Sequence, residues 1–209
     1  MYKSWDEWQG NLLVEGFYTD LSDVFALTEI GIENGVLIKE RRNESGARVF
    51  GGTLEGKLAY KNIWQLQAGL TLQKSKYKEA HAWAEDVEAV KDMFRTPDVY
   101  GYFVTSYNPL KQFMLSLSGT YTGSMLVEHH AGYIEANRTE RTAGFMDLNF
   151  KAAYDFSLYN HIKLQLNAGV QNILNAYQKD FDQGPDRDSG YIYGPATPRC
   201  FYLGVKLSY

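Results

Sequence analysis

Apolar and polar residues alternate with a period of two along most of this chain. The last eleven residues show the pattern most clearly, since alternate positions are apolar: Phe201, Leu203, Val205, Leu207 and Tyr209. Such alternation predicts a β-strand with one apolar and one mixed polar face. Chain termini usually fray unless a sheet holds them. We therefore expect both edges of this strand to be paired, as they are in a closed barrel.

The same pattern predicts eight strands, joined by connections that alternate between long and short. The strands cover residues 12–27, 49–60, 64–73, 99–107, 112–122, 146–154, 162–171 and 199–209. The long connections are residues 30–48, 78–97, 123–141 and 173–198, and the short turns lie at residues 61–63, 108–110 and 159–160. Antiparallel neighbours joined by such short turns form hairpins. His161, beside the third turn, is expected at the barrel rim.

One segment departs from the alternation. Between Lys78 and Phe94 the apolar residues Trp83, Val87 and Val90 recur at spacings of three and four, among Ala, Glu and Lys. This spacing predicts a short helix inside a loop.

Alternation alone does not separate a membrane barrel from a soluble barrel that turns its apolar face inward. On most strands the apolar face carries no charge, whereas the opposite faces carry Glu55, Lys57, Asp147, Lys151, Lys163 and Lys206. Five aromatic residues fall at the short-turn ends, where a membrane girdle belongs: Tyr60, Trp64, Phe113, Tyr154 and Tyr209. We therefore expect an all-β fold, an antiparallel up-and-down transmembrane β-barrel with long loops at one rim and short turns at the other.

The facing of the seventh strand is the sharpest expectation from this pattern. Leu164, Leu166 and Val170 should contact lipid, and Lys163, Gln165 and Asn167 should line the interior.

The amino-acid composition argues against several classes of protein. The 209 residues carry a net charge of −4 without a basic tract, so no nucleic-acid partner is expected. A single cysteine excludes an intrachain disulfide. The mean hydropathy of −0.38 is compatible with a membrane barrel, because alternate strand residues face its interior. Residues 1–8 lack the features of a signal peptide, so either a leader has been removed or the chain is a piece of a longer protein.

Candidate chemistry is sparse, and we expect neither an enzyme nor a cofactor. Cys200 has no matched catalytic partner. Neighbouring residues of an extended chain point to opposite faces, so we expect no metal site at Glu128-His129-His130. The aspartates Asp180, Asp182, Asp186 and Asp188 lack the spacing of an EF-hand, and we interpret them as a solvated acidic loop.

The loop aromatics are the better candidates for ligand binding. They are Tyr133, Tyr177, Phe181, Tyr191 and Tyr193. Rings with polar tips can stack on sugars or on chelate rings while tolerating water. The alternative is that these rings only pack the loops over the barrel mouth.

Three segments together resemble the C-terminal part of TonB-dependent outer-membrane receptors. They are Gly10-Asn-Leu-Leu-Val-Glu-Gly-Phe-Tyr-Thr-Asp20, Gly169-Val-Gln-Asn-Ile-Leu-Asn-Ala-Tyr177 and Tyr193-Gly-Pro-Ala-Thr-Pro-Arg199. The final strand also resembles the terminal signal of bacterial outer-membrane barrels, which implies that Phe201, Leu203, Val205, Leu207 and Tyr209 are read by the barrel-assembly machinery. The family's barrel has twenty-two strands and follows a plug domain. The resemblance therefore implies that residues 1–209 are a partial barrel, about the last third, without a plug.

The resemblance also implies a function and a location. A receptor of this family sits in the lipid of the Gram-negative outer membrane and takes up a scarce ligand, such as an iron chelate, cobalamin or a glycan. TonB supplies the energy through the plug domain, which is absent from this chain. Two alternatives remain open from the residues: a complete eight-stranded envelope barrel with a structural or adhesive role, and a soluble ligand-binding β-barrel.

Overall fold

The computed structural model describes residues 2–43, 45–158 and 162–209, and all regular secondary-structure elements in this part of the chain are β-strands. Its strands are β1 (Tyr2–Trp5), β2 (Trp8–Leu21), β3 (Phe25–Glu33), β4 (Val36–Asn43), β5 (Ala47–Tyr60), β6 (Trp64–His81), β7 (Val90–Asp92), β8 (Val99–Leu110), β9 (Phe113–Thr122), β10 (Leu126–His129), β11 (Arg138–Arg141), β12 (Phe145–Ser157), β13 (Lys163–Gln171) and β14 (Cys200–Ser208). None of the described residues forms a helix that is long and apolar enough to cross a membrane.

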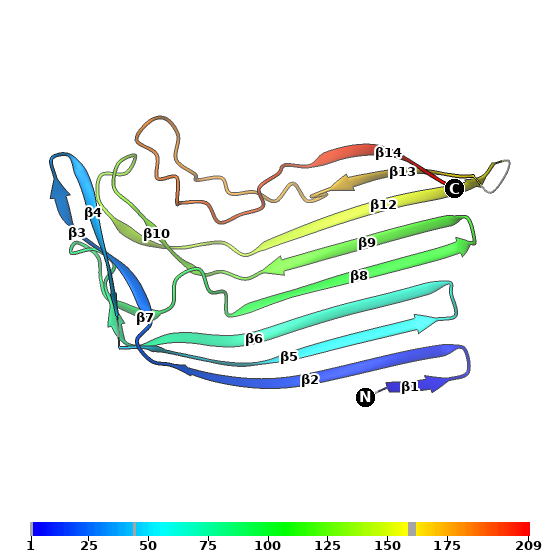
Figure 1. Cartoon of the computed structure of the whole chain (residues 1–209), viewed down its shortest axis with the longest axis horizontal. Helices are drawn as coiled ribbons and strands as arrows, with labels where there is room; N and C mark the ends of the chain where they lie inside the picture. Colours follow the sequence, from blue (N-terminus) through cyan, green and yellow to red (C-terminus); the bar gives the residue numbers. More distant parts are fainter. Residues whose placement is uncertain (1, 44, 159–161) are drawn as a thin grey trace.

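Nine of these strands form one antiparallel up-and-down sheet (Figure 1). Its order is β1-β2-β5-β6-β8-β9-β12-β13-β14, with β7 paired to β6 outside this path. The hairpins β3–β4 and β10–β11 form separate two-stranded sheets. The predicted fold class is therefore confirmed, and the short strand β1 is an addition to the eight expected strands. Within the described residues β1 and β14 lie at opposite edges of the sheet, which is open rather than closed.

Strand register aligns the apolar positions of neighbouring strands on one face. Residues directly opposite each other in an antiparallel pair point to the same side. Phe150 pairs with Val170, and Val170 pairs with Phe201. Val14, Leu54 and Leu70 form a matching row across β2, β5 and β6. The eight long strands thus share one continuous apolar face.

The opposite face is polar and is joined by hydrogen bonds between strands. Thr53 Oγ1 lies 3.0 Å from Thr71 Oγ1, and the Gln67 amide donates to the Tyr102 hydroxyl at 3.0 Å. Between β13 and β12, the Gln165 amide donates to Asp155 at 2.8 Å. These bonds satisfy polar groups that would be costly to leave unpaired in a half-buried position.

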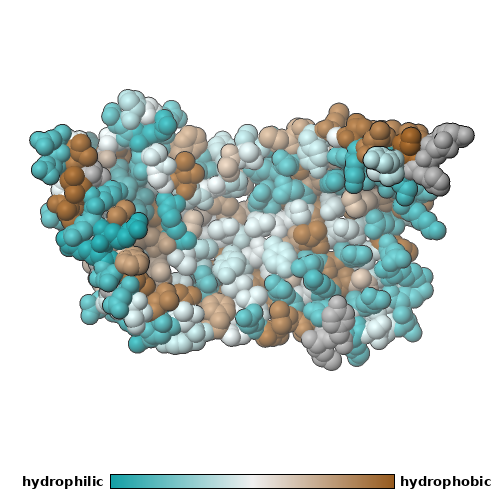
Figure 2. All heavy atoms as spheres, viewed as in Figure 1, coloured by the Kyte–Doolittle hydropathy of each residue, from teal (hydrophilic) through white to brown (hydrophobic). Residues whose placement is uncertain are grey.

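The sheet is curved so that the polar face is concave. Figure 2 shows hydrophilic and intermediate residues over the middle of the sheet, while hydrophobic residues line its upper right edge, over β13 and β14. On that edge Leu203 is 89% exposed and Val205 is 70% exposed. Leu166 lies on the same apolar side as these residues, and Gln165 and Asn167 lie on the polar side, as predicted. An exposed apolar face of this extent is typical of a surface that meets lipid.

Aromatic side chains form the predicted girdle at the short-turn end of the apolar face. The rings of Trp8 and Tyr60 lie 4.9 Å apart, and Trp8 lies 6.1 Å from Trp64. Farther along the rim Tyr154 lies 6.2 Å from Phe113 and 4.7 Å from Phe156. Tyr209, which follows β14, is fully exposed.

The predicted helix between Lys78 and Phe94 is wrong. Strand β6 continues to His81, and β7 pairs back onto β6 through Val90 opposite His81. Trp83 is buried between loops, and Phe94 forms an isolated bridge with Leu126. The spacing of three and four therefore comes from separate anchoring points and not from one helix face.

The predicted strand 12–27 and loop 30–48 are also wrong in part. Strand β2 ends at Leu21, and the chain turns before β3 begins at Phe25. Most of the supposed loop is the β3–β4 hairpin, whose turn residues Asn34 and Gly35 both have positive φ, of 51° and 78°. Asn-Gly is the preferred pair for this type of turn. That signal was present in the sequence and was missed.

Two smaller points concern the short turns. The turn at residues 61–63 is as predicted, whereas β8 extends to Leu110 and the chain turns at residues 111–112 rather than 108–110. The turn expected at Tyr159-Asn160 and the rim position of His161 lie outside the described residues.

Candidate functional site

Four segments meet at the end of the sheet opposite the aromatic girdle (Figure 1). They are the β3–β4 hairpin, residues 82–97, residues 123–141 with β10 and β11, and the strandless loop 173–198. We call this region the loop end. Its side chains are joined by hydrogen bonds and ring contacts between segments that lie far apart in the sequence.

His129, at the end of β10, holds loop 173–198 from one side. Its Nε2 lies 3.0 and 3.1 Å from the two carboxylate oxygens of Asp182, and both side chains are buried. Its ring stacks on Tyr191, with centroids 3.6 Å apart and planes 5° apart. The backbone N–H of Asp188 donates to the same carboxylate at 2.9 Å. One residue of β10 therefore fixes both Asp182 and Tyr191.

His130 points the opposite way, toward the β3–β4 hairpin. Its Nδ1 lies 2.6 Å from Glu29 Oε1, and Lys39 Nζ lies 3.2 Å from its Nε2. The ring meets the edge of Trp83 at 4.6 Å between centroids. Trp83 is buried, and its indole N–H donates to Thr139 Oγ1 at 3.1 Å. The two histidines thus serve different partners, and the structure does not bring them into one site.

Tyr191 and Tyr193 share one carboxylate. The Tyr191 hydroxyl donates to Asp180 Oδ2 at 2.9 Å, and the Tyr193 hydroxyl donates to Asp180 Oδ1. Burial and the bond to Asp180 raise the pKa of Tyr191, and the same causes raise the pKa of Tyr193 to about 12. Partial burial opposes ionisation of Asp180, but the tyrosine hydroxyls outweigh it and hold the pKa of Asp180 below its usual value. At neutral pH the arrangement is a carboxylate held by two protonated tyrosines.

Loop 173–198 keeps its shape through side chain to backbone bonds. Asn172, buried and with φ of 47°, donates to the carbonyls of Ala176 and Thr197, both at 2.9 Å. The Gln178 amide donates to the Tyr191 carbonyl at 3.0 Å. Arg95 reaches over from residues 82–97 and donates to the carbonyls of Gly190 and, at 3.0 Å, Ile192. These bonds replace the ladder that a strand would provide.

The loop lines a partly open cavity of about 800 Å³ with a largely apolar lining. Its walls are Asn175, Tyr177, Gln178, Phe181, Asp182, Gln183, Gly184, Arg187, Asp188, Ser189, Tyr191, Ile192, Gly194, Pro195, Ala196 and Pro198. Sites for small ligands usually enclose about 300–1,000 Å³ and are mainly apolar with a few polar groups. This cavity is the candidate ligand site.

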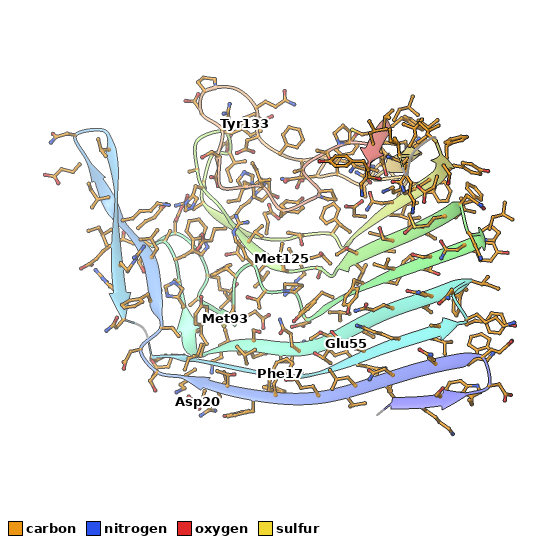
Figure 3. The ribbon with its side chains drawn as sticks, turned by 45° about the vertical axis from the view of Figure 1, so that its right-hand side comes forward. Phe17, Asp20, Glu55, Met93, Met125 and Tyr133 are labelled. Carbon is orange, nitrogen blue, oxygen red and sulfur yellow. The ribbon has the colours of Figure 1, made fainter. Side chains whose placement is uncertain are left out.

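Three of the five predicted aromatic residues line this cavity, namely Tyr177, Phe181 and Tyr191. Tyr193 packs against Phe145 instead, at 5.8 Å between ring centroids. Tyr133 stands near the top of the loop end in Figure 3 and is 56% exposed. The interpretation of the aspartates as a solvated acidic loop is wrong for Asp182, which is buried against His129 and lines the cavity. Sequence reasoning missed most of the other lining residues, because an irregular loop has no periodicity that would mark them.

A model of the TonB dependent receptor-like β-barrel family matches residues 2–173. The chain belongs to the TonB-dependent receptor family. Its members are outer-membrane receptors of Gram-negative bacteria, which agrees with the sequence-based resemblance. Among curated proteins there is no match.

Solved receptor structures share the fold of this chain. The ferric-catecholate import receptor Fiu from E. coli K12 is 21% identical with a TM-score of 0.62, over 95% of this chain and 25% of the receptor. The copper transporter OprC is 17% identical with a TM-score of 0.63, over 98% and 29%. The ferric enterobactin receptor PfeA from Pseudomonas aeruginosa is 17% identical with a TM-score of 0.62, also over 98% and 29%. The chain therefore spans between a quarter and a third of these receptors.

Proposed function

We propose that the chain forms part of the membrane-spanning barrel of a receptor that takes up a scarce ligand across the Gram-negative outer membrane. The observation that carries this proposal is the continuous apolar convex face opposite a polar concave face, in a chain that belongs to the receptor family. The cargo is an iron chelate, cobalamin or a glycan. An iron chelate has the most support, since two of the similar structures carry names of iron-chelate receptors.

The orientation of the chain follows from the two ends of the sheet. In outer-membrane barrels the short turns face the periplasm and the long loops face the medium. The girdle of Trp8, Tyr60 and Trp64 then lies at the periplasmic boundary, and the cavity of loop 173–198 opens toward the outside. The receptor moves its ligand and performs no catalysis. TonB drives the transport through a plug domain that lies outside these residues.

Uptake by cells tests this proposal. In a host that depends on the natural-length protein, uptake of labelled ferric chelates, cobalamin and oligosaccharides is measured with TonB present and depleted. One of the three should enter in a TonB-dependent way. Replacing both Tyr177 and Phe181 by Ala should reduce that uptake, whereas replacing Leu174, which is exposed in the same loop but outside the cavity lining, should not. The absence of TonB-dependent uptake of all three ligand classes would contradict the proposal.

Strand β14 supports a further part of the proposal, the recognition of Phe201, Leu203, Val205, Leu207 and Tyr209 by the barrel-assembly machinery. The four strand residues of this set share the apolar face, and all five are highly exposed. Replacing Tyr209 by Ser should lower the amount of receptor in the outer membrane. The matched control is Ser208→Ala, one residue earlier. Equal amounts of both variants would contradict a role in assembly.

The two alternatives that the sequence left open have less support. A soluble ligand-binding barrel would bury its apolar face, whereas here Leu203 is 89% exposed and Val205 is 70% exposed. A complete eight-stranded barrel would pair its first and last strands, whereas the described strands form an open sheet.

A further inference from the structure

Most polar side chains around the cavity are already engaged within the protein. Gln178 donates to the Tyr191 carbonyl at 3.0 Å and accepts from the Tyr193 N–H at 3.1 Å. The Asp188 carboxylate accepts from the backbone N–H groups of His130, at 3.0 Å, and Gly190, at 2.8 Å. Their hydrogen-bonding capacity therefore goes to holding the loop rather than to a ligand.

The same holds for Asn175 and Asp182. The Asn175 side-chain oxygen accepts from the Arg199 N–H at 3.0 Å. The Asp182 carboxylate is buried against His129 and accepts from the Asp188 N–H.

Arg187 is the exception among the charged lining residues. It makes no hydrogen bond or ion pair with the rest of the described chain, and its side chain is exposed at the cavity. A guanidinium presents a fork of donors that matches a carboxylate in bidentate fashion. The charge that the cavity can offer directly to a ligand is therefore positive.

Apolar contact area remains available beside this cation. Tyr177 is 42% exposed, Phe181 is 49% exposed and Ile192 is 61% exposed. Tyr191 forms a buried part of the wall, because its ring is stacked on His129 and its hydroxyl is bonded to Asp180. A wall that is fixed before the ligand arrives lowers the entropy lost on binding.

We propose that this cavity binds a flat aromatic group that carries a single negative charge, of the aryl carboxylate class. The ring packs against Tyr177, Phe181 and Ile192, and the anion pairs with Arg187. The inference deepens the proposed function and rests on it for the role of the bound group as part of the transported ligand. Asp180, Asp182 and Asp188 keep their negative charges, but each carboxylate already accepts at least two hydrogen bonds from the protein, so fewer of its acceptor sites remain for a cationic ligand.

Three probes with the same ring test this assignment on the purified natural-length protein in detergent. They are 2-naphthoate, neutral 2-naphthol and cationic 2-naphthylmethylammonium, with affinities measured by calorimetry. We expect 2-naphthoate to bind most tightly. Arg187→Ala should weaken 2-naphthoate about tenfold, as expected for loss of a charge-assisted pair, and leave 2-naphthol unchanged.

Two further variants serve as controls for the effect of Arg187→Ala. Arg187→Lys keeps the charge and should retain most of the preference for 2-naphthoate. Lys179→Ala removes an exposed cation of the same loop that does not line the cavity, and it should change nothing. Each variant must show the heat-dependent gel mobility of the parent, which reports a folded barrel. If Arg187→Ala fails this criterion, Arg187→Gln takes its place.

The inference is overturned if the parent binds none of the probes, or binds 2-naphthol or the ammonium probe as tightly as 2-naphthoate. It is also overturned if folded Arg187→Ala, or folded Arg187→Gln in its place, binds 2-naphthoate like the parent. Binding to the purified protein does not need TonB. Failure of uptake in cells with 2-naphthoate binding intact therefore contradicts only the proposed function, and TonB-dependent uptake without probe binding contradicts only this inference.

Discussion

The sheet and the loop end of this molecule are held together in different ways. Strands β5 and β6 pair through fourteen consecutive residues, from Ala47 opposite Tyr77 to Tyr60 opposite Trp64, without a break in register. Loop 173–198 contains no strand and is held by single side chains such as Asn172, Gln178 and Arg95. Loss of one side chain should therefore destabilise the sheet little, because many backbone bonds remain. In the loop end the same loss should destabilise the local structure strongly.

The largest expected effect concerns Trp83, which is 1% exposed at the centre of the loop end. Trp83→Ala should reduce the free energy required to unfold the loop end by about 3–5 kcal/mol, because it removes a fully buried ring. Hydrogen exchange should accelerate in residues 82–97 and 123–141 and stay unchanged in β5 and β6. The control is Trp5→Ala at the opposite end, where the ring is 43% exposed. Uniform acceleration across the sheet would show that the two regions are one cooperative unit.

A charge on the convex face tests the sheet itself. Leu54→Arg places a cation in the middle of β5, between Val14 and Leu70, and should reduce the free energy of unfolding from lipid by about 2–4 kcal/mol. Glu15→Arg, on the polar face of the neighbouring strand, should be tolerated. Urea titration in liposomes measures both. If Glu15→Arg is the more damaging, the lipid-facing side has been assigned wrongly.

The same substitution near the girdle sharpens the comparison. Register places Leu166 opposite Tyr154, at the level of the aromatic rings, so Leu166→Arg should reduce the free energy of unfolding by only about 0–1 kcal/mol. Asn167→Arg, on the polar side, is its matched control and should have a smaller effect still. A loss as large as that of Leu54→Arg would mean that the girdle does not mark the membrane boundary.

The smallest effect is a dependence on pH in the loop end. The pKa of Tyr193 is raised to about 12, so the stabilisation from its bond to Asp180 is complete below the usual tyrosine pKa of 10.0 and is lost as pH rises through about 12. Absorbance of tyrosinate should show one fewer tyrosine ionising near pH 12 in Tyr193→Phe. In Tyr133→Phe, which alters an exposed tyrosine, that late ionisation should remain. Identical titrations of the two variants would contradict the arrangement.

The same arrangement has an acid limit. The pKa of Asp180 is lowered from its usual value of 3.8, so its contribution to stability is present above pH 3.8 and is lost only as pH falls through the lower value of the folded protein. Exchange of loop 173–198 should therefore remain slow at pH 4. Asp180→Asn should remove the acid step.

The sheet could be predicted from the sequence because its information is local. Alternation along Leu164, Leu166 and Val170 marks one face, and register then brings like faces together without further information. The ends of the strands were harder to predict, because β6 continues through Lys74 and Lys76, where the apolar pattern has already stopped. The Asn34-Gly35 turn was a local signal as well, and it was overlooked.

The loop end could be predicted only in outline. Aromatic chemistry pointed to five loop residues, of which Tyr177, Phe181 and Tyr191 line the cavity and Tyr133 and Tyr193 do not. The contact between His129 and Asp182 joins residues 53 positions apart. No spacing along a single sequence encodes such a contact, and the same is true of Arg187, which becomes notable only when its neighbours are seen to be occupied.

The two adjacent histidines have a consequence for how the length of this chain can change. His129 reaches loop 173–198 and His130 reaches the β3–β4 hairpin, because consecutive residues of an extended segment point to opposite sides. A deletion of one residue upstream in β10 would exchange the two partners, whereas a deletion of two would restore the original sides. Insertions and deletions in this segment should therefore be tolerated only in even numbers of residues. At the irregular tip of loop 173–198 around Gly184 the chain has no pleat to preserve, so insertions and deletions of either odd or even length should be tolerated there.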